Sequence, residues 1–514
     1  MKMDTRRERD RTLEERERAR RRARKRRRRR AMMIRSVLSV ALLVCVVGGA
    51  IALTNIVRRM NNENEARESG RDGTAHSVSA SRKNQEVALE TEKATERKET
   101  ETEKSPLQQA ELLAMGYDYD GAIALLKGVP GYESNAEMTQ AIQKYEQQKA
   151  SCVAVDVTKV PHIFYHSLVN DTDSAFNVSV LGQSAVDGMN AWMTTVEEFD
   201  KITQQMYDNG YVFVRLRDLV VETKDENGQV HFAPNTNLML PPDKKPVVLS
   251  VDDLSYYHSY EKASYPDKLV LDEKGQVKCH YVKPDGTEEV GDFDVVPRLN
   301  TFLEKHPDGA YKGARGMIAL TGYNGVFGYR TDSDYKLKQN LMEDQKKWLD
   351  EHPDFNWDQE VEEAKKIAEA IKASGWEFAS HTWGHLSVTN RTAEQLKTDN
   401  EKWVATVQNI VGPVDTIIFA HGNDIGDWQG YSDSNEKYRY YKEAGYNFFC
   451  NVDSSTPYWV QIQDQYVRQG RIDLDGYLLY KATQGGTDVL NAMFSPQEVF
   501  DRRRPVPVVA NGEG

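Results

Sequence analysis

The sequence is poor in cysteine. Its 514 residues contain four, Cys45, Cys152, Cys279 and Cys450, and no two of them form a CxxC pair. This scarcity and spacing exclude a disulfide framework or a cysteine zinc knuckle as the basis of the fold. A bridge between Cys152 and Cys450 stays open, although nothing in the sequence requires it.

Beyond the first 59 residues positive charge is outnumbered, since 47 Lys and Arg stand against 73 Asp and Glu. Those 59 contain 20 Lys and Arg against 6 Asp and Glu, a net of +14, so the rest of a chain whose total is −12 carries −26. A domain with such an excess of negative charge repels polyanions, which excludes nucleic acid as its partner. The length allows two or three domains.

The stretch 36–57, SVLSVALLVCVVGGAIALTNIV, lacks charge altogether. Its 22 residues match a hydrocarbon core of about 30 Å at about 1.5 Å per residue. It has no amphipathic stripe, and its basic leader is too long for a cleaved signal peptide. We therefore predict a single membrane-spanning helix. The arginine-rich block before it predicts a cytoplasmic arm over residues 1–35 and places the rest of the chain on the extracellular face of the cell membrane.

Residues 58–105 have few apolar side chains, which predicts a disordered spacer. Residues 106–151 show 3.6-residue apolar spacing in two blocks separated by Gly128–Asn135, which predicts a helical hairpin similar to one tetratricopeptide unit. One such unit buries its faces poorly alone, so it packs on the next domain or binds a protein partner. We expect residues 504–514 to form an unstructured tail.

From residue 152 to 503, strand patterns alternate with helical ones. Such alternation predicts an α/β fold with a parallel sheet or barrel, whose chemistry lies at the carboxyl ends of the strands. The stretch 258–313 interrupts this order with alternating apolar residues and turn signals. It reads as a β-rich insertion that borders the substrate cleft.

Two of the predicted strands end in groups suited to metal chemistry. PVVLSVDD ends in Asp252 and Asp253, and GWEFASHTWGH ends in His381 and His385. Either cluster alone is compatible with a polar turn. Together, two imidazoles and one carboxylate make a three-ligand set for a divalent ion with one open position, and the second carboxylate is available as a base.

These motifs are shared with a known family. The stretch 152–503 resembles the NodB-homology polysaccharide deacetylases of carbohydrate esterase family four, in a membrane-anchored bacterial form. VPHIFYHSLV is similar to the family's opening strand, SVDD stands where the family usually has TFDD, and SHTWGH matches the [S/T]HxxxH motif with the same spacing. The resemblance covers about two thirds of the chain. It implies a distorted (β/α) barrel of seven or fewer strands.

The resemblance also implies roles for individual residues. Asp252 would be the general base. Asp253, His381 and His385 would hold the metal, which in this family is commonly zinc. The implied activity is hydrolysis of N-acetyl groups from a polysaccharide.

The sequence departs from the family at two motifs. FAHGNDIGDW (419–428) lacks the Arg usual in the third motif, and no histidine follows His421 where the family has a late histidine acid. If the chain is active, its acid comes from elsewhere, and His421 and His166 are the candidates because both end predicted strands. Arg471 and Asp473, in RIDLDGY, lie near the strand where the family has a supporting Arg and Asp.

Three functional hypotheses follow. The first is a metal-dependent hydrolase that removes N-acetyl groups from cell-wall peptidoglycan or an extracellular amino-sugar polysaccharide. The second is a catalytically inactive, glycan-binding scaffold of the same fold, which the missing Arg and late His favour. The third is a different metallohydrolase, such as a peptide amidase, which predicts no amine release from acetylated sugars. The intact carboxylate and histidine pairs favour the first.

Overall fold

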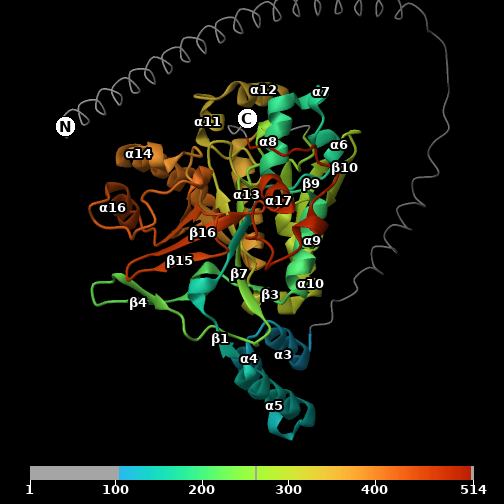
Figure 1. The fold of residues 1–514 in the computed structure, drawn as a ribbon, viewed down its shortest axis with the longest axis vertical. Helices are drawn as coiled ribbons and strands as arrows, with labels where there is room; N and C mark the ends of the chain where they lie inside the picture. The colour runs from blue at the N-terminus through green and yellow to red at the C-terminus, as the bar shows by residue number, and fades with distance from the viewer. Residues whose placement is uncertain (1–103, 261–262, 511–514) are drawn as a thin grey trace, which may run out of the picture. The chain divides into compact units, whose positions relative to one another are not determined.

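The computed structural model describes residues 104–260 and 263–510 (Figure 1). The predicted cytoplasmic arm (1–35), the predicted membrane helix (36–57) and nearly all of the predicted spacer (58–105) lie outside the described residues and stay predictions. Within the described part of the chain, no helix is both long and apolar enough to cross a membrane.

Seven parallel strands form a closed barrel, which confirms the predicted fold class. In order around the ring they are β2 (His162–Tyr165), β7 (Lys245–Asp252), β11 (Met317–Leu320), β12 (Glu377–Ser380), β13 (Thr416–Ile418), β14 (Phe448–Val452) and β16 (Val467–Asp473). Pairing of β16 with β2 and of β7 with β11 closes the ring. Two strands extend it: β3 (Tyr211–Phe213) pairs with β7, and β15 (Trp459–Ile462) runs antiparallel to β16.

The barrel strands are apolar on both faces because each face meets a separate core. Along β7, Val247, Leu249 and Val251 pack with the surrounding helices. Val248 joins the second apolar cluster, which contains alternate residues of the other barrel strands. Ser250 and Asp252 continue the face of Val248, since side chains alternate along a strand. The hydrophobic run of β7 therefore ends with a carboxylate on the barrel's inner face.

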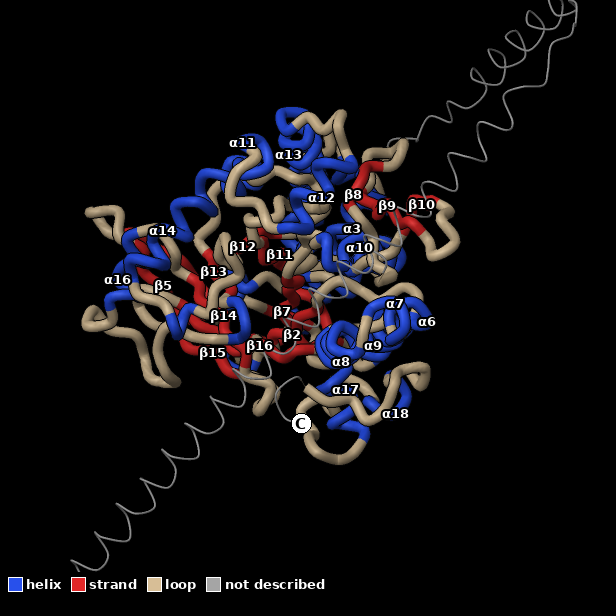
Figure 2. The backbone as a smooth tube through the Cα atoms, turned by 90° about the horizontal axis from the view of Figure 1, so that it is seen from above, coloured by secondary structure: helices blue, strands red, loops and turns tan. Residues whose placement is uncertain are grey.

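Helices surround the strands, as the view from above shows (Figure 2). The longer ones are α8 (Gln183–Trp192), α9 (Val196–Asp208), α10 (Val295–Lys305), α12 (Glu343–Glu351), α13 (Trp357–Ala373), α14 (Ala393–Trp403), α16 (Glu436–Glu443) and α17 (Gly476–Thr483). Short helices are α6 (Thr172–Ala175), α7 (Val178–Leu181), α11 (Ser333–Leu337), α15 (Asn409–Val411) and α18 (Pro496–Val499). Local sequence sets their starts: Thr195 and Glu198 form a capping box at α9, and Asn356 caps α13.

The predicted hairpin contains three helices, not two: α3 (Pro106–Met115), α4 (Tyr119–Lys127) and α5 (Ala136–Ser151). The first predicted helix breaks at Gly116–Asp118, because Gly116 ends α3 and the Asp118 side chain caps α4. The hairpin packs on the barrel, since its apolar cluster includes Val212 of β3. A protein partner bound by the hairpin stays a prediction.

The predicted β-rich insertion is only partly β. Strands β8 (Lys268–Leu271), β9 (Val277–Val282) and β10 (Glu288–Gly291) form an antiparallel meander, whereas α10 fills much of the remainder. Two small antiparallel pairs lie elsewhere: β4 (Val220–Lys224) with β5 (Val230–Pro234), and β1 (Val153–Ala154) with β6 (Met239–Leu240).

The structure also tests two other predictions, the tail over residues 504–514 and the bridge between Cys152 and Cys450. Residues 505–510 have no helix or strand, but Arg504 is buried and forms an ion pair with buried Glu198. The deacetylase-like unit therefore extends at least to Arg504, one residue past the predicted boundary. Cys152 and Cys450 are both free and buried, so the bridge that the sequence left open is not formed.

Candidate active site

The two adjacent aspartates lie where β7 leaves the barrel. Asp252 is the last residue of the strand, and Asp253 adopts a φ of 60°. This left-handed conformation is uncommon for a residue with a side chain, and such strain is concentrated at functional sites. Thr382, His385 and His421 also have positive φ. Both aspartates are buried.

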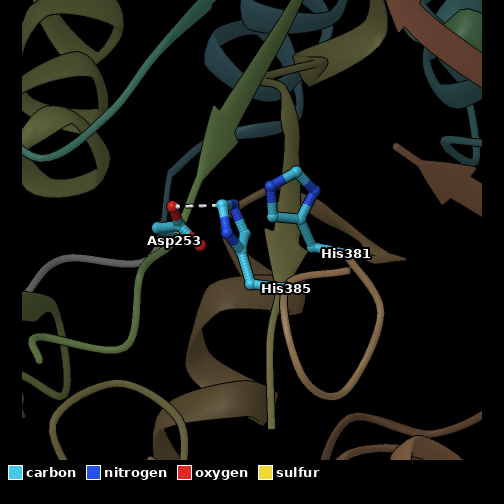
Figure 3. Close-up of side chains that lie close together, drawn as sticks. All are labelled: Asp253, His381 and His385. Atoms are coloured by element: carbon cyan, nitrogen blue, oxygen red, sulfur yellow. Dashed lines mark ion pairs between the residues drawn. The ribbon is translucent and has the colours of Figure 1, made fainter. Parts of the chain in front are cut away.

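Asp253, His381 and His385 come together into one cluster, in which the carboxylate lies close to the His385 ring (Figure 3). Their candidate ligand atoms all lie within 4.8 Å of one another, and Asp253 Oδ2 is 3.5 Å from His385 Nε2. Tyr257 donates a hydrogen bond of 2.7 Å to the other oxygen, Oδ1, and so orients the carboxylate. Burial would raise the pKa of Asp253, but the neighbouring His385 and His381 outweigh it and lower the pKa.

His381 has the tautomer that a metal ligand needs. Its Nδ1 lies 2.7 Å from the carbonyl oxygen of Ile418, which can only accept, so Nδ1 carries the hydrogen and Nε2 keeps its lone pair. Burial lowers the pKa of His381 against the opposing charge of Asp252, which keeps the ring neutral. Two imidazoles and a carboxylate held in this way fit a divalent ion.

The loop between the two histidines is fixed from outside the motif. Asp399 of α14 accepts hydrogen bonds from the backbone N–H groups of Trp383 and Gly384, at 2.7 and 2.9 Å. Thr382 Oγ1 accepts another from the Leu386 N–H at 2.8 Å. Sequence reasoning missed Asp399, because an aspartate within a helical pattern is indistinguishable from one on a solvated helix face.

Asp252 is held by an arginine. The guanidinium of Arg471, on β16, donates to Oδ1 and Oδ2 of Asp252 at 2.8 and 2.9 Å, a bidentate pair. Arg471 also donates to Ser250 at 3.1 Å and lies 4.0 Å from the centre of the Phe164 ring. Burial would raise the pKa of Asp252, but Arg471, together with His381, lowers it to about 2. Asp252 is therefore ionised at neutral pH and can accept a proton.

The comparisons with known proteins bear on this cluster. Residues 354–446, which include His381, His385 and His421, match the family model of polysaccharide deacetylase. This part of the chain is therefore similar to polysaccharide deacetylases. A solved structure of Streptococcus pyogenes deacetylase PplD in complex with acetate matches over 64% of this chain and 98% of that one, at 14% identity and a TM-score of 0.30. No curated protein matches significantly.

Of the two candidate acids, His421 lies against the cluster, and His166 follows the neighbouring strand β2. The ring centre of His421 is 4.3 Å from that of His385, and its Nε2 lies 3.1 Å from the His385 carbonyl oxygen. Burial and His385 lower the pKa of His421. His166 is half-buried, and its buried Nδ1 has no hydrogen-bond partner among the described residues. His166 follows β2, which pairs with the strand β7 that ends in Asp252, and it is among the groups that act against burial to lower the pKa of Asp252 and Asp253.

Strand β16 supplies an arginine that the 419–428 loop lacks. From the sequence, only the family resemblance singled out Arg471, because no local pattern shows which residue it faces. The apolar pattern of strand β16 could have identified Arg471, because a cation within a buried strand needs a buried anion as its partner. The missing third-motif Arg therefore does not leave Asp252 without an arginine partner.

A second buried acid group lies near the base. Burial raises the pKa of Asp473 well above its ordinary range, with help from the charges of Asp475 and Asp252. Burial also raises the pKa of Asp475 to about 7. Asp473 therefore retains its proton at neutral pH, so Asp252 keeps its charge without the charge of Asp473 beside it.

Arg471→Met is expected to lower the free energy of unfolding by about 3–5 kcal/mol, because it leaves the buried Asp252 charge uncompensated. In this variant, burial acts on Asp252 without the arginine and raises its pKa. The contribution of Asp252 to the stability of the variant is therefore lost as pH rises through this raised pKa. In the wild type the contribution is present above the ordinary pKa of 3.8 and is lost as pH falls toward 2. Urea unfolding across pH measures both effects, and the acid limb of the activity profile moves to higher pH.

The control for this prediction is the double variant Asp252→Asn/Arg471→Met, which removes both charges. It is expected to recover a large part of the lost stability. Equal destabilisation by the single and double variants contradicts the pairing.

Proposed function

We propose that the protein is a metal-dependent N-deacetylase that acts on amino sugars of cell-wall peptidoglycan or of an extracellular polysaccharide, anchored to the cell membrane by residues 36–57. Deacetylation as the reaction rests on the family match. One observation carries the metal dependence: Asp253, His381 and His385 converge beside an ionised Asp252. The other histidine- and carboxylate-rich motifs of the sequence offer no comparable set among the described residues.

The chemistry starts from a weak electrophile, because an N-acetyl group is an amide. A divalent ion, such as zinc, held by Asp253, His381 and His385 would polarise the amide carbonyl and lower the pKa of water. Asp252 accepts the proton of the attacking water as general base. Arg471 fixes the direction of the Asp252 carboxylate and keeps it ionised between turnovers.

The leaving amine needs a proton, and His166 is the better placed donor. His421 already points Nε2 at the His385 carbonyl, and its lowered pKa disfavours the protonated form. His166 has a buried ring nitrogen without a partner and lies near both carboxylates. The water oxygen adds to the carbonyl carbon, the C–N bond breaks, and the proton from His166 goes to nitrogen. Acetate and a free amino sugar leave.

His166→Asn is expected to lower kcat on N-acetyl sugars by about 10²–10⁴, the usual contribution of general acid catalysis. Hydrolysis of p-nitrophenyl acetate is expected to change little, because its leaving group needs no proton. His421→Asn is the matched comparison, with a smaller loss on the amide. A greater amide loss in His421→Asn than in His166→Asn reverses the assignment.

A carbohydrate substrate is favoured by the loop that follows His421. Trp428 on this loop is 76% exposed, whereas Tyr256 and Tyr257 are buried. Buried Arg468 holds the loop by donating to the Asp424 carboxylate at 2.6 Å and to the Asp427 carbonyl at 2.7 Å. The exposed indole of Trp428, on the loop that follows His421, offers an apolar face for a sugar ring.

The proposal is tested by incubating the full-length protein and zinc with N-acetylated peptidoglycan and with chitin oligomers, and measuring acetate. Acetate with an equal amount of free amine is the expected result, and the preferred substrate identifies the polymer. Metal binding without acetate from either substrate points to the peptide-amidase alternative. A protein that binds no metal and releases no acetate supports the alternative of an inactive glycan-binding scaffold.

A further inference from the structure

One buried carboxylate joins two loops of the candidate site. Asp294 is fully buried, and its side chain caps α10 inside the predicted insertion. Its Oδ1 accepts hydrogen bonds from the backbone N–H groups of Val295 at 2.8 Å and Leu168 at 3.0 Å. Its Oδ2 accepts a third hydrogen bond, from the Tyr256 hydroxyl at 2.8 Å. The bond to Val295 belongs to the helix cap, whereas the other two reach loops far away in the sequence.

The bond to Leu168 holds the loop that carries one candidate acid. Leu168 lies two residues after His166, and both follow strand β2. Asn170 on the same loop donates to the carbonyl oxygen of Phe293, the residue before Asp294, at 2.9 Å. The loop after β2 is therefore attached to the start of α10 at two points. A loop attached in this way limits where the His166 ring can lie.

The bond to Tyr256 holds the loop that carries a candidate metal ligand. Tyr256 precedes Tyr257, whose hydroxyl donates to Asp253 Oδ1 at 2.7 Å. Tyr256 is buried and adopts a φ of 48°, which is uncommon for a residue with a side chain. Such a conformation persists only where surrounding contacts impose it. The Asp294 carboxylate is one of these contacts, and Arg330, which donates to the Tyr256 carbonyl oxygen at 3.0 Å, is another.

Asp294 is charged in spite of its burial. Burial raises the pKa of Asp294 to about 6, against the three groups that donate to it. The carboxyl group is therefore ionised at neutral pH, and an ionised carboxylate accepts hydrogen bonds at every position. Hydrogen bonds to a charged group are also stronger than those between neutral groups. The charge thus strengthens the attachment of both loops to α10.

We propose that Asp294 is a positioning residue for the deacetylation, which sets the position of the proton donor His166 relative to Asp253 by holding the loops after β2 and β7 against α10. The inference rests on the proposed function, in which both residues act on the same amide. Misplacement of a catalytic group by about 1 Å costs roughly 10²-fold in rate. On this proposal, the insertion 258–313 is part of the framework of the active site.

Asp294→Ala removes all three hydrogen bonds, and Asp332→Ala is its matched control. Asp332 is also a buried aspartate that caps a helix, α11, and burial raises its pKa to about 6 as well. Among the described residues, its carboxylate accepts from its own loop, namely from the Asp334 N–H at 3.2 Å and the Ser333 hydroxyl at 3.4 Å. Asp294→Asn is the conservative variant, because its amide oxygen can still accept from the Leu168 N–H.

The first measurement is kcat of the full-length zinc-loaded protein on an N-acetylglucosamine oligomer and on p-nitrophenyl acetate, whose leaving group needs no proton. Asp294→Ala is expected to lower the amide-to-ester ratio of kcat by about 10²-fold. Asp332→Ala is expected to keep the wild-type ratio even where it lowers stability, and Asp294→Asn is expected to recover most of the ratio. An equal loss on both substrates in Asp294→Ala shows a merely structural role and overturns the proposal.

Tyr256→Phe tests the second loop and replaces Asp294→Ala where that variant does not fold. It removes one hydroxyl and keeps the Leu168 bond, so the amide-to-ester ratio is expected to stay unchanged. Zinc affinity, measured by competition with a fluorescent chelator, is expected to fall by about tenfold, the lower end of the effect of residues that orient a ligand. Wild-type zinc affinity in Tyr256→Phe overturns the role at this loop.

Hydrogen–deuterium exchange separates this proposal from failure of the proposed function, because it requires no turnover. Backbone amides of residues 166–170 are expected to exchange faster in Asp294→Ala than in Asp332→Ala or the wild type, since the Leu168 N–H loses its acceptor. Faster exchange together with weaker zinc binding supports the proposal even where no substrate is deacetylated. Unchanged exchange in a folded Asp294→Ala protein contradicts it.

Discussion

His381→Gln is expected to abolish stoichiometric binding of a divalent ion and, with it, deacetylation. Replacing residues that merely orient a ligand costs about 10–100-fold in metal affinity, and loss of the ligand itself costs more. The substitution removes the Nε2 lone pair of His381. The amide group of the introduced glutamine can still donate a hydrogen bond to the Ile418 carbonyl oxygen, as Nδ1 does in the wild type. The metal content of the purified protein, measured by mass spectrometry, reports the effect directly.

The control is His231→Gln, which changes a histidine on β5 that pairs with Asp464 away from the cluster. This variant is expected to keep both metal and activity. Thermal unfolding of the two variants shows whether His381→Gln is folded. A folded His381→Gln protein with a full equivalent of metal contradicts the ligand assignment.

Asp252→Asn is expected to lower kcat by about 10²–10⁴ while leaving the bound metal in place. The carboxylate is lost as a proton acceptor, but Asp252 does not belong to the cluster of Asp253, His381 and His385. The amide oxygen still accepts one of the two hydrogen bonds from Arg471, so the fold is retained at reduced stability. Acetate release and metal content are measured on the same preparation.

Asp253→Asn is the informative comparison, since the two aspartates are neighbours with different partners. It is expected to lose metal as well as activity.

The lowered pKa of Asp252, about 2, also predicts that Asp252 does not set an acid limb of the wild-type activity profile above pH 4. If Asp252→Asn loses metal and Asp253→Asn keeps it, the two roles are exchanged.

The fold was predictable because its signals are local. The apolar run before Asp252 indicated a strand buried on both faces, alternation with amphipathic helices indicated a parallel sheet or barrel, and the family resemblance implied the barrel. The positions of Asp252, Asp253, His381 and His385 at strand ends then followed, because carboxyl ends of parallel strands meet at one rim. The hairpin's third helix was missed because Gly116 and the Asp118 cap interrupt an apolar pattern that continues through them.

The supporting residues of the site were less accessible to sequence reasoning. Arg471 and Asp399 act on residues 219 and 16 positions away, respectively, and neither has a local pattern that names its partner. The helix α10 inside the expected β-rich insertion shows the same limit, because turn signals predict breaks in the chain but not what lies between them. Pairing across the barrel is decided by packing, which no short window contains.

The most direct test of the metal-dependent mechanism is a zinc titration of the chelator-treated full-length protein, with acetate release from the preferred N-acetylated substrate followed at each addition. The mechanism predicts no acetate before zinc is added and a linear rise that ends at one equivalent. It also predicts no rise in His381→Gln. Full activity in the chelator-treated protein, verified to be metal-free, would contradict the mechanism.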